Sequence, residues 1–278
     1  MSSIKDRQRA AARARLEKEM AERAAAARKR RQRQTIIGSA IAVVVIAGAT
    51  VWLVNAMKDD KKKSPSASSS AAAVPAGFTA CTWTPQTGGG KVKDVGTPPP
   101  TAPKTGTSTL TMDTNLGKIT ATLDKSKVPC TTSSFAYLGS KKFWDNTKCH
   151  RLVNEKSFQV LQCGDPFATG KGYRETDGQG GPSYTMAEEN LPTDTNNPYP
   201  EGSIAMANTG QPGSTGSQFF IVTADTKLPA NYTLLGKVTS GLDIVKDVVK
   251  AGDDGAFASS AGGGHPKKEL VFKTITVS

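Results

Sequence analysis

The strongest constraint on this chain is a polar loop enclosed by two apolar segments, within residues 202–223 (GSIAMANTGQPGSTGSQFFIVT). Apolar residues at 204–207 and aromatic or β-branched residues at 218–222 predict two buried strands. The Gly, Pro, Ser and Thr residues between them supply the backbone angles of a turn-rich connection. A loop held between buried strands is rigidly positioned, so we expect it to form the edge of a binding site.

From residue 108 to the end, the pattern predicts a mostly β domain. Residues 109–114 and 118–123 alternate apolar and polar positions on either side of the turn at 115–117, which is typical of a β-hairpin. Further strands are expected at residues 148–153, 158–163, 204–208, 218–222 and 233–239, with a short helix ending at Leu138 and a second over 242–250. Because strands dominate and the turns are Gly-rich, we expect a closed antiparallel β-barrel capped by two helices.

Residues 35–54 (TIIGSAIAVVVIAGATVWLV) carry no charge and are long enough to cross about 30 Å of hydrocarbon as one transmembrane helix. The Arg/Lys cluster at 28–33 places the N-terminus in the cytoplasm. A cleaved signal peptide is the alternative, but the apolar segment starts late and no clear small-x-small site follows it. We therefore expect an uncleaved signal anchor in the cell membrane, with the rest of the chain outside the cytoplasm.

The net charge of +12 is concentrated near the N-terminus. Residues 1–34 hold twelve basic and four acidic side chains, whereas residues 109–278 hold seventeen of each. The large C-terminal part therefore has no basic excess with which to follow a phosphate backbone, and we expect no nucleic-acid partner. Residues 1–34 are interpreted as a basic cytoplasmic tail that fixes the orientation of the anchor.

Residues 55–107 are expected to be a linker, because Ser, Ala, Pro and Gly dominate them and cannot bury a core. Cys81 and Trp83 are unusual in such a segment. They suggest that residues near 78–85 touch the folded domain, through a disulfide or by packing.

Several segments of the domain, in the same order, resemble the cyclophilin-type peptidyl-prolyl cis/trans isomerases. They are the loop at 202–223, Cys149-His150-Arg151, Gln162-Cys163-Gly164-Asp165, Gly178–Gly181 before Tyr184 and Glu188–Asn190, and Leu234–Val238 before Gly241–Asp243. The resemblance covers residues 108–278 and is closest to the membrane-anchored, extracytoplasmic cyclophilins of actinobacteria. It implies a cyclophilin-like barrel that isomerises X–Pro bonds of exported proteins without a cofactor, a metal or a covalent intermediate.

The resemblance also assigns roles to individual residues. Arg151, Gln162 and Phe220 are the predicted catalytic residues: Arg151 donates to the prolyl nitrogen, Gln162 bonds a substrate carbonyl, and Phe220 forms the floor of a proline socket. A guanidinium suits this reaction because it is always charged and can stabilise the localised nitrogen lone pair of the twisted amide. The predicted substrate-binding residues are Val160, Met206, Ala207, Asn208, Gln218, Leu228, Tyr232 and Phe158. The backbone of Asn208 would hold the peptide extended, Ala207 and Gln218 would line the groove, and either Met206 or Val160 would close the socket together with Leu228.

Three positions depart from the family pattern. Phe158 lies one residue further from Gln162 than the family's Phe, which in a strand would turn it to the other face unless a bulge intervenes. Lys227 takes the place of the Trp associated with tight cyclosporin binding, and Tyr232 that of the pocket His. We therefore expect weak cyclosporin binding. The alternative function is a proline-peptide-binding or chaperone module with weak or no catalysis.

Four cysteines, Cys81, Cys130, Cys149 and Cys163, allow three disulfide connectivities. Their spacing contains no Cys-x-x-Cys pair, which argues against zinc. An extracytoplasmic location favours disulfides. The family hairpin would bring Cys149 and Cys163 face to face, as a disulfide or as two buried thiols, and Cys81 would then reach Cys130.

Overall fold

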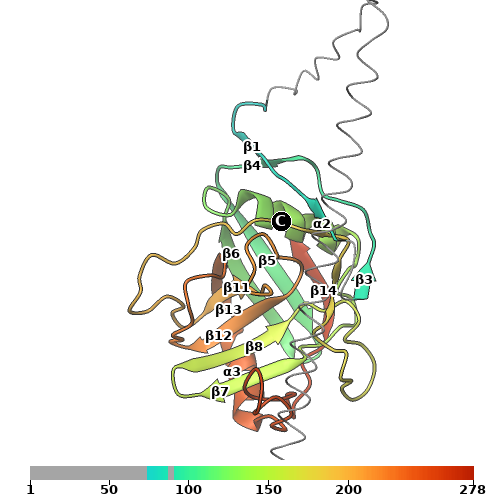
Figure 1. Cartoon of the computed structure of the whole chain (residues 1–278), viewed down its shortest axis with the longest axis vertical. Helices are drawn as coiled ribbons and strands as arrows, with labels where there is room; N and C mark the ends of the chain where they lie inside the picture. The colour runs from blue at the N-terminus through green and yellow to red at the C-terminus, as the bar shows by residue number, and fades with distance from the viewer. Residues whose placement is uncertain (1–73, 87–90) are drawn as a thin grey trace, which may run out of the picture. The chain divides into compact units, whose positions relative to one another are not determined.

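The computed structural model describes residues 74–86 and 91–278 (Figure 1). The predicted cytoplasmic tail (1–34) and transmembrane segment (35–54) lie outside these residues, as do residues 55–73 of the predicted linker. Among the helices that are described, none is long and apolar enough to cross a bilayer.

One antiparallel sheet of eight strands carries the fold (Figure 1). The strands are β5 (Thr107–Thr114), β6 (Gly117–Asp124), β7 (Arg151–Glu155), β8 (Phe158–Cys163), β11 (Ser203–Met206), β12 (Phe219–Ala224), β13 (Leu234–Ser240) and β14 (Phe272–Val277). Their order across the sheet is β14-β5-β6-β13-β11-β12-β8-β7. The predicted hairpin is present as β5 and β6, and the predicted mostly β architecture is confirmed.

The two end strands of this sheet, β14 and β7, are not joined by a ladder within the described residues. The start of β14 and the residue two positions before it do meet the segment before β7: the Phe272 amide donates to the Thr147 carbonyl at 2.8 Å, and the Cys149 amide donates to the Leu270 carbonyl at 3.0 Å. The sheet is therefore a curled, nearly closed half-barrel, and the full closure expected from the sequence is not seen as strand pairing.

Two helices pack against the sheet, as predicted. Helix α2 (Pro129–Ser140) begins with Pro at its first turn and lies against β14, while α3 (Leu242–Ala251) lies against β6, β7 and β12. In α3 the buried side chains are Val245, Val248 and Val249, the spacing of a helix with one apolar face. The main core, which surrounds Phe135, Trp144 and Phe219, fills the space between these helices and one face of the sheet.

The folded unit extends on the N-terminal side of the predicted boundary at residue 108. The N-terminal extension, residues 74–86 and 91–107, contributes β1 (Phe78–Ala80), β2 (Thr84–Pro85), β3 (Lys91–Lys93) and β4 (Thr101–Pro103). Strands β1 and β4 pair with each other, β2 pairs with β10 (Tyr184–Thr185), and β3 pairs in parallel with β9 (Gly180–Pro182). A segment poor in apolar residues is ordered here because its backbone groups are paired, in part within the extension (β1 with β4) and in part with β9 and β10.

Two side chains fix the extension, at the position where Cys81 and Trp83 were unusual for a linker. Cys81 is bonded to Cys130 at the start of α2, and the Trp83 ring lies edge-on to Tyr184 with centroids 5.3 Å apart. The second disulfide joins Cys149 and Cys163. Both cysteine pairings inferred from the resemblance are therefore present.

Candidate active site

A second apolar cluster lies on the face of the sheet opposite the main core. Along β12, Phe219 and Ile221 enter the main core, whereas Phe220 and Val222 belong to the second cluster. This alternation follows from the period of two in a strand. We call the second cluster the socket cluster: buried Val153, Val160, Tyr199, Ala205, Phe220 and Val222, with partly buried Phe158, Ala207, Leu228, Tyr232 and Leu234 around them.

Six residues predicted for the proline socket come together in this cluster: Phe158, Val160, Ala207, Phe220, Leu228 and Tyr232. Phe220 is only 4% exposed and meets the Tyr232 ring edge-on at a centroid distance of 5.6 Å. These segments are far apart in the sequence, and the sheet brings β8, β12 and the loop after β12 to one place.

The prediction that Met206 helps to close the socket is wrong, because Met206 lies in the main core. Met206 is fully buried in the main core, and it pairs across the strands with Phe219, another main-core residue. Its neighbour Ala205 pairs with Phe220 and faces the socket cluster. Adjacent residues of a strand point to opposite faces, and of the two residues Met206 and Val160 only Val160 belongs to the socket cluster.

Phe158 reaches the socket without the reversal that its offset suggested. It lies two residues before Val160 and four before Gln162, so the three side chains share one face of β8. Its ring lies 5.6 Å from the guanidinium carbon of Arg151, within the range of a cation–π contact. A register shift that could absorb an extra residue does occur nearby, on β12 between Val222 and Ala224.

Arg151 stands at the start of β7, directly opposite Gln162 on β8. Its guanidinium has three partners: Nη1 donates to Gln162 Oε1 at 3.0 Å, Nε donates to the Gly262 carbonyl at 3.2 Å, and Nη2 donates to the Ala261 carbonyl. Burial lowers the pKa of Arg151, while the nearby Tyr232 and Glu155 oppose that shift. A guanidinium stays charged under such conditions, so the site carries a fixed cation beside the socket.

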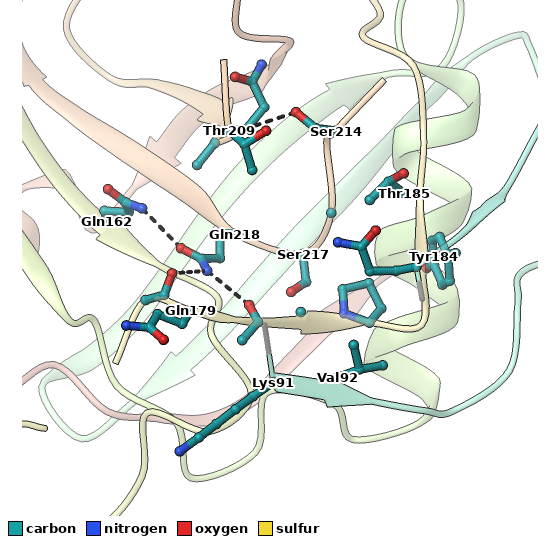
Figure 2. Close-up of a pocket in the computed structure, with 18 residues that line it drawn as sticks. Lys91, Val92, Gln162, Gln179, Tyr184, Thr185, Thr209, Ser214, Ser217 and Gln218 are labelled. Carbon is teal, nitrogen blue, oxygen red and sulfur yellow. Dashed lines mark hydrogen bonds between the residues drawn. The ribbon is translucent and has the colours of Figure 1, made fainter. Parts of the chain in front are cut away.

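A chain of side-chain amides continues from Arg151 into the domain, and Figure 2 shows its part from Gln162 onward. Gln162 Nε2 donates to Gln218 Oε1 at 3.0 Å, and Gln218 Nε2 donates to the carbonyls of Gly178 and Gly180 at 2.8 and 2.9 Å. Each amide has its rotamer fixed at both ends, so Gln162 presents a defined edge to Arg151. Gln162 and Gln218 were predicted as substrate contacts, and the structure adds that they order each other.

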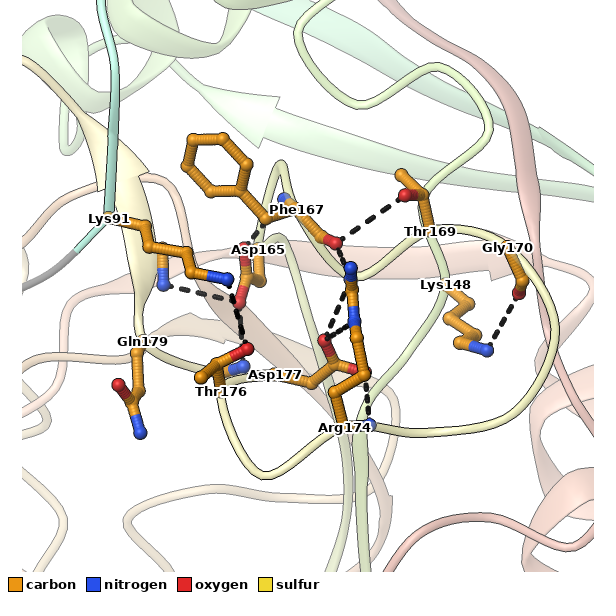
Figure 3. Close-up of polar contacts among 12 residues, drawn as sticks. Lys91, Lys148, Asp165, Phe167, Thr169, Gly170, Arg174, Thr176, Asp177 and Gln179 are labelled. Atoms are coloured by element: carbon orange, nitrogen blue, oxygen red, sulfur yellow. Dashed lines mark hydrogen bonds and ion pairs between the residues drawn. The ribbon is translucent and has the colours of Figure 1, made fainter.

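The two glycines whose carbonyls accept from Gln218 are themselves held by one buried carboxylate, that of Asp165 (Figure 3). Asp165, which is fully buried, accepts from the amides of Gly178 and Gly180 at 2.6 and 3.1 Å. Arg174 and Asp177 form an ion pair at 3.0 Å within the same loop. The Gly-rich motif therefore supplies carbonyl groups whose position is determined by Asp165.

A cavity of about 490 Å³ shares Ala207 with the socket cluster and is also lined by Gln162 and Gln218 (Figure 2). Asn208 lines it, and within the described residues neither its backbone amide nor its carbonyl has a hydrogen-bond partner. These groups are free to pair with an extended peptide, which is the role predicted for the Asn208 backbone. Strand β3 of the N-terminal extension adds Lys91 and Val92 to the cavity wall, a contribution that the sequence did not indicate.

Tyr199 was missed because an aromatic residue between prolines carries no strand or helix pattern. Its hydroxyl donates to the Pro229 carbonyl and accepts from the Tyr232 amide, both at 3.0 Å. Burial raises the pKa of Tyr199 to about 12, so the hydroxyl remains a donor at neutral pH. It thereby fixes the loop that presents Leu228 and Tyr232 to the socket.

His150 precedes Arg151 but points into the protein interior, where it is 2% exposed. Within the described residues neither ring nitrogen has a hydrogen-bond partner. Burial lowers its pKa to about 4, against the opposing effect of Asp165 and Asp177. The imidazole is therefore neutral at physiological pH and adds no second positive charge beside Arg151.

A curled eight-stranded antiparallel sheet with two helices and a socket on its outer face defines the cyclophilin fold. A cyclophilin from Cryptosporidium parvum superposes with a TM-score of 0.51, covering 62% of this chain and 98% of that protein at 24% sequence identity. The family model described as "Cyclophilin type peptidyl-prolyl cis-trans isomerase/CLD" matches residues 109–276. The chain belongs to this family, which confirms the resemblance seen in the sequence.

Relatives from mycobacteria are similar over the same region. "Probable peptidyl-prolyl cis-trans isomerase B" of Mycobacterium leprae is 40% identical over 192 residues, which cover 64% of this chain and 60% of the relative. The protein of the same name from Mycobacterium tuberculosis (strain CDC 1551 / Oshkosh) is 42% identical over 178 residues, covering 60% of this chain and 52% of the relative. The matched region thus spans little more than half the length of these relatives.

Proposed function

We propose that this protein accelerates cis/trans isomerisation of X–Pro bonds in exported, incompletely folded proteins. Rotation about a peptide bond faces a barrier of about 18–20 kcal/mol, because the nitrogen lone pair is delocalised into the carbonyl. The two X–Pro isomers differ by only about 0.5–1 kcal/mol, so the task is to lower the barrier in both directions. A site of this kind has to hold the proline ring and stabilise the twisted amide better than either planar form.

The socket cluster provides the first requirement. Phe220, Val160 and Tyr232 form an apolar surface on which a pyrrolidine ring can be buried. The free backbone groups of Asn208 hold the flanking peptide in an extended conformation. Binding of this kind fixes both sides of the X–Pro bond and leaves the bond itself free to rotate.

Arg151 provides the second requirement. A guanidinium has five N–H donors. Three are engaged by Gln162, Ala261 and Gly262, which leaves two (5 − 3) for the substrate. Donation to the prolyl nitrogen is favourable only when its lone pair localises, so this interaction stabilises the twisted state selectively.

The observation that carries this proposal is the contact of Arg151 with Phe158, which places an anchored cation at the rim of the apolar socket. The test is a protease-coupled isomerisation assay with an X–Pro peptide, comparing the wild type with Arg151→Ala. We expect kcat/KM to fall roughly 10- to 100-fold, the value of a hydrogen bond from a charged donor. Lys156→Ala, at an exposed position of the same hairpin, serves as the matched control and should leave kcat/KM unchanged.

Two outcomes would count against the proposal. An active Arg151→Ala variant would remove the guanidinium from the mechanism. An inactive wild type that still binds proline peptides would favour the alternative, a peptide-binding or chaperone module. Tyr232 and the exposed Lys227, which differ from the family pattern, would then explain the loss of catalysis. The same two residues underlie the expectation that cyclosporin binds weakly.

The proposed location is the outer face of the cell membrane, with residues 35–54 as a single-pass anchor and the N-terminus in the cytoplasm. Support comes from the uncharged length of this segment and the basic cluster before it. The two disulfides add support, since such bonds persist outside the reducing cytoplasm. Alkaline extraction of membranes should leave the protein in the pellet. Its release into the soluble fraction would contradict the anchor.

A further inference from the structure

A loop between α3 and β14, residues 253–265, runs beside Arg151; we call it the arginine loop. It is attached to β7 by two backbone bonds: the Leu152 amide donates to the Gly264 carbonyl at 2.8 Å, and the Gly264 amide donates to the Leu152 carbonyl at 3.0 Å. This attachment brings the carbonyls of Ala261 and Gly262 to the guanidinium. Within the described residues, Arg151 is the only hydrogen-bond partner of these two carbonyls.

The arginine loop has little in its own sequence to fix its shape. The sequence GAFASSAGGGH interpreted from composition alone indicates a flexible loop. Gly262 and Gly263 both have positive φ, and a Cβ at Gly263 would meet the Leu152 carbonyl oxygen. Glycine allows the close approach but does not enforce it, since it has the largest conformational freedom of all residues.

The two ends of the arginine loop are joined by Asp254 and His265. Asp254 Oδ2 bonds His265 Nδ1 at 2.8 Å, and Asp254 Oδ1 accepts from the His265 amide at 2.7 Å. The Asp254 amide in turn donates to the His265 carbonyl at 3.1 Å. Three hydrogen bonds between one pair of residues form a clamp at the base of the loop.

The imidazole of this clamp is held between two aromatic rings. It stacks on Tyr173 with centroids 4.6 Å apart and an interplanar angle of 12°, and Phe257 meets it edge-on at 4.7 Å. The Tyr173 hydroxyl also donates to the Pro266 carbonyl at 3.0 Å. The His265 side chain is only 13% exposed as a result, although the prediction from sequence placed it in a flexible segment.

We infer that His265 is a positioning residue for Arg151, acting with Asp254 through the carbonyls of Ala261 and Gly262. The inference rests on the proposed isomerase function. Because His265 stacks on Tyr173 and Phe257 and is not among the residues of the socket cluster, loss of the clamp leaves peptide binding unchanged. Loss of the clamp does, however, leave the Arg151 guanidinium free to change its orientation. Its two free N–H donors then no longer point at the prolyl nitrogen, and stabilisation of the transition state is lost.

The test is a double-mutant cycle in the full-length protein. His265→Ala should lower kcat about tenfold while KM changes less than about twofold, the signature of an interaction made only in the transition state. In an Arg151→Ala background the same change should have no further effect, because coupled residues are not additive. His265→Asn, whose side-chain amide can donate to Asp254, should restore most of the activity. Ser259→Ala, at an exposed position of the same loop, is the control.

A second measurement separates this inference from the proposed function. The Nε–H resonance of Arg151 in a ¹H–¹⁵N spectrum reports its bond to the Gly262 carbonyl whether or not the protein is active. We expect this resonance to shift and exchange faster with water in His265→Ala, and to be retained in His265→Asn. An unchanged resonance, or an equal loss of activity in both backgrounds, would overturn the inference. An inactive wild type with the expected spectral change would instead contradict the isomerase proposal alone.

Discussion

Reduction of the Cys149–Cys163 disulfide should destabilise the hairpin that carries the candidate catalytic pair. Cys149 lies two residues before Arg151, and Cys163 directly follows Gln162. Both cysteines are fully buried. In the described part of the chain β7 is an end strand whose neighbouring strand is β8, and an isolated bridge joins Leu152 to Gly264 on its other side. The Cys149–Cys163 cross-link adds a covalent restraint on its position.

The magnitude follows from the length of the closed loop. The two cysteines are separated by 14 positions. A cross-link of roughly 15 residues removes about 3 kcal/mol of chain entropy from the unfolded state at 25 °C. We therefore expect the free energy of unfolding to fall by about 3 kcal/mol on reduction. Domains of this kind are stable by about 5–15 kcal/mol, so the reduced protein should remain folded at 25 °C.

The assay is urea unfolding followed by tryptophan fluorescence, in a Cys81→Ala/Cys130→Ala background so that a single disulfide can be reduced. Oxidised and reduced samples then differ only in the S–S bond, and thiol titration confirms the state of each. The m-value should rise on reduction, because the uncrosslinked unfolded chain exposes more surface. A loss of stability below about 1 kcal/mol would refute the reasoning, since it would mean that the loop is already restricted in the unfolded chain.

Three further predictions test other parts of the site. Burial lowers the pKa of His150 to about 4, from 6.5 in the unfolded chain, so between these pH values His150 is protonated only in the unfolded state. The free energy of unfolding should therefore fall by up to about 3 kcal/mol from pH 7 to pH 4. An equal loss in His150→Gln would contradict this assignment. Phe220→Ala and Met206→Ala should each lower the free energy of unfolding by about 2–5 kcal/mol, measured in urea. Only Phe220→Ala should raise KM for proline peptides. A higher KM in both variants would mean that the two faces of the sheet are not independent. Removal of the Cys81–Cys130 disulfide by alanine substitution should raise KM for long peptides more than KM for a tetrapeptide, because the N-terminal extension lines the cavity. An equal change in KM for both peptides would show that the extension is not part of the site.

Much of the fold was accessible from the sequence because local patterns determine it. The β5–β6 hairpin follows from alternation about one turn, and α3 follows from its apolar spacing. The candidate site was accessible for a different reason: Arg151, Gln162 and Phe220 lie within short motifs whose residue types the chemistry requires. The structure brings the socket residues into one cluster beside Arg151, and the catalytic roles remain predictions for the assays above.

The features of the fold and the site that were not predicted depend on which face of the sheet a side chain occupies, or on contacts between residues far apart in the sequence. Met206 and Val160 are both apolar strand residues, and only the strand register decides which one faces the socket. The N-terminal extension has the composition of a linker, yet it is ordered by a disulfide to Cys130 and by pairing with β9 and β10. His265 lies in a Gly-rich segment, and its partner Tyr173 is far from it in the sequence. None of these contacts leaves a local pattern.

The contacts of His265 and those of the amide chain both bear on one group, the Arg151 guanidinium. A guanidinium on an end strand would be mobile, and an arginine side chain loses about 2 kcal/mol of rotamer entropy when it is fixed. Here Gln162, held by the amide chain, and the arginine loop, held by Asp254 and His265, restrict it from two sides. The entropic cost of fixing this side chain is therefore met during folding, before the substrate arrives, and does not weaken substrate binding. An electrostatic catalyst with no covalent step depends on such preorganisation for its rate.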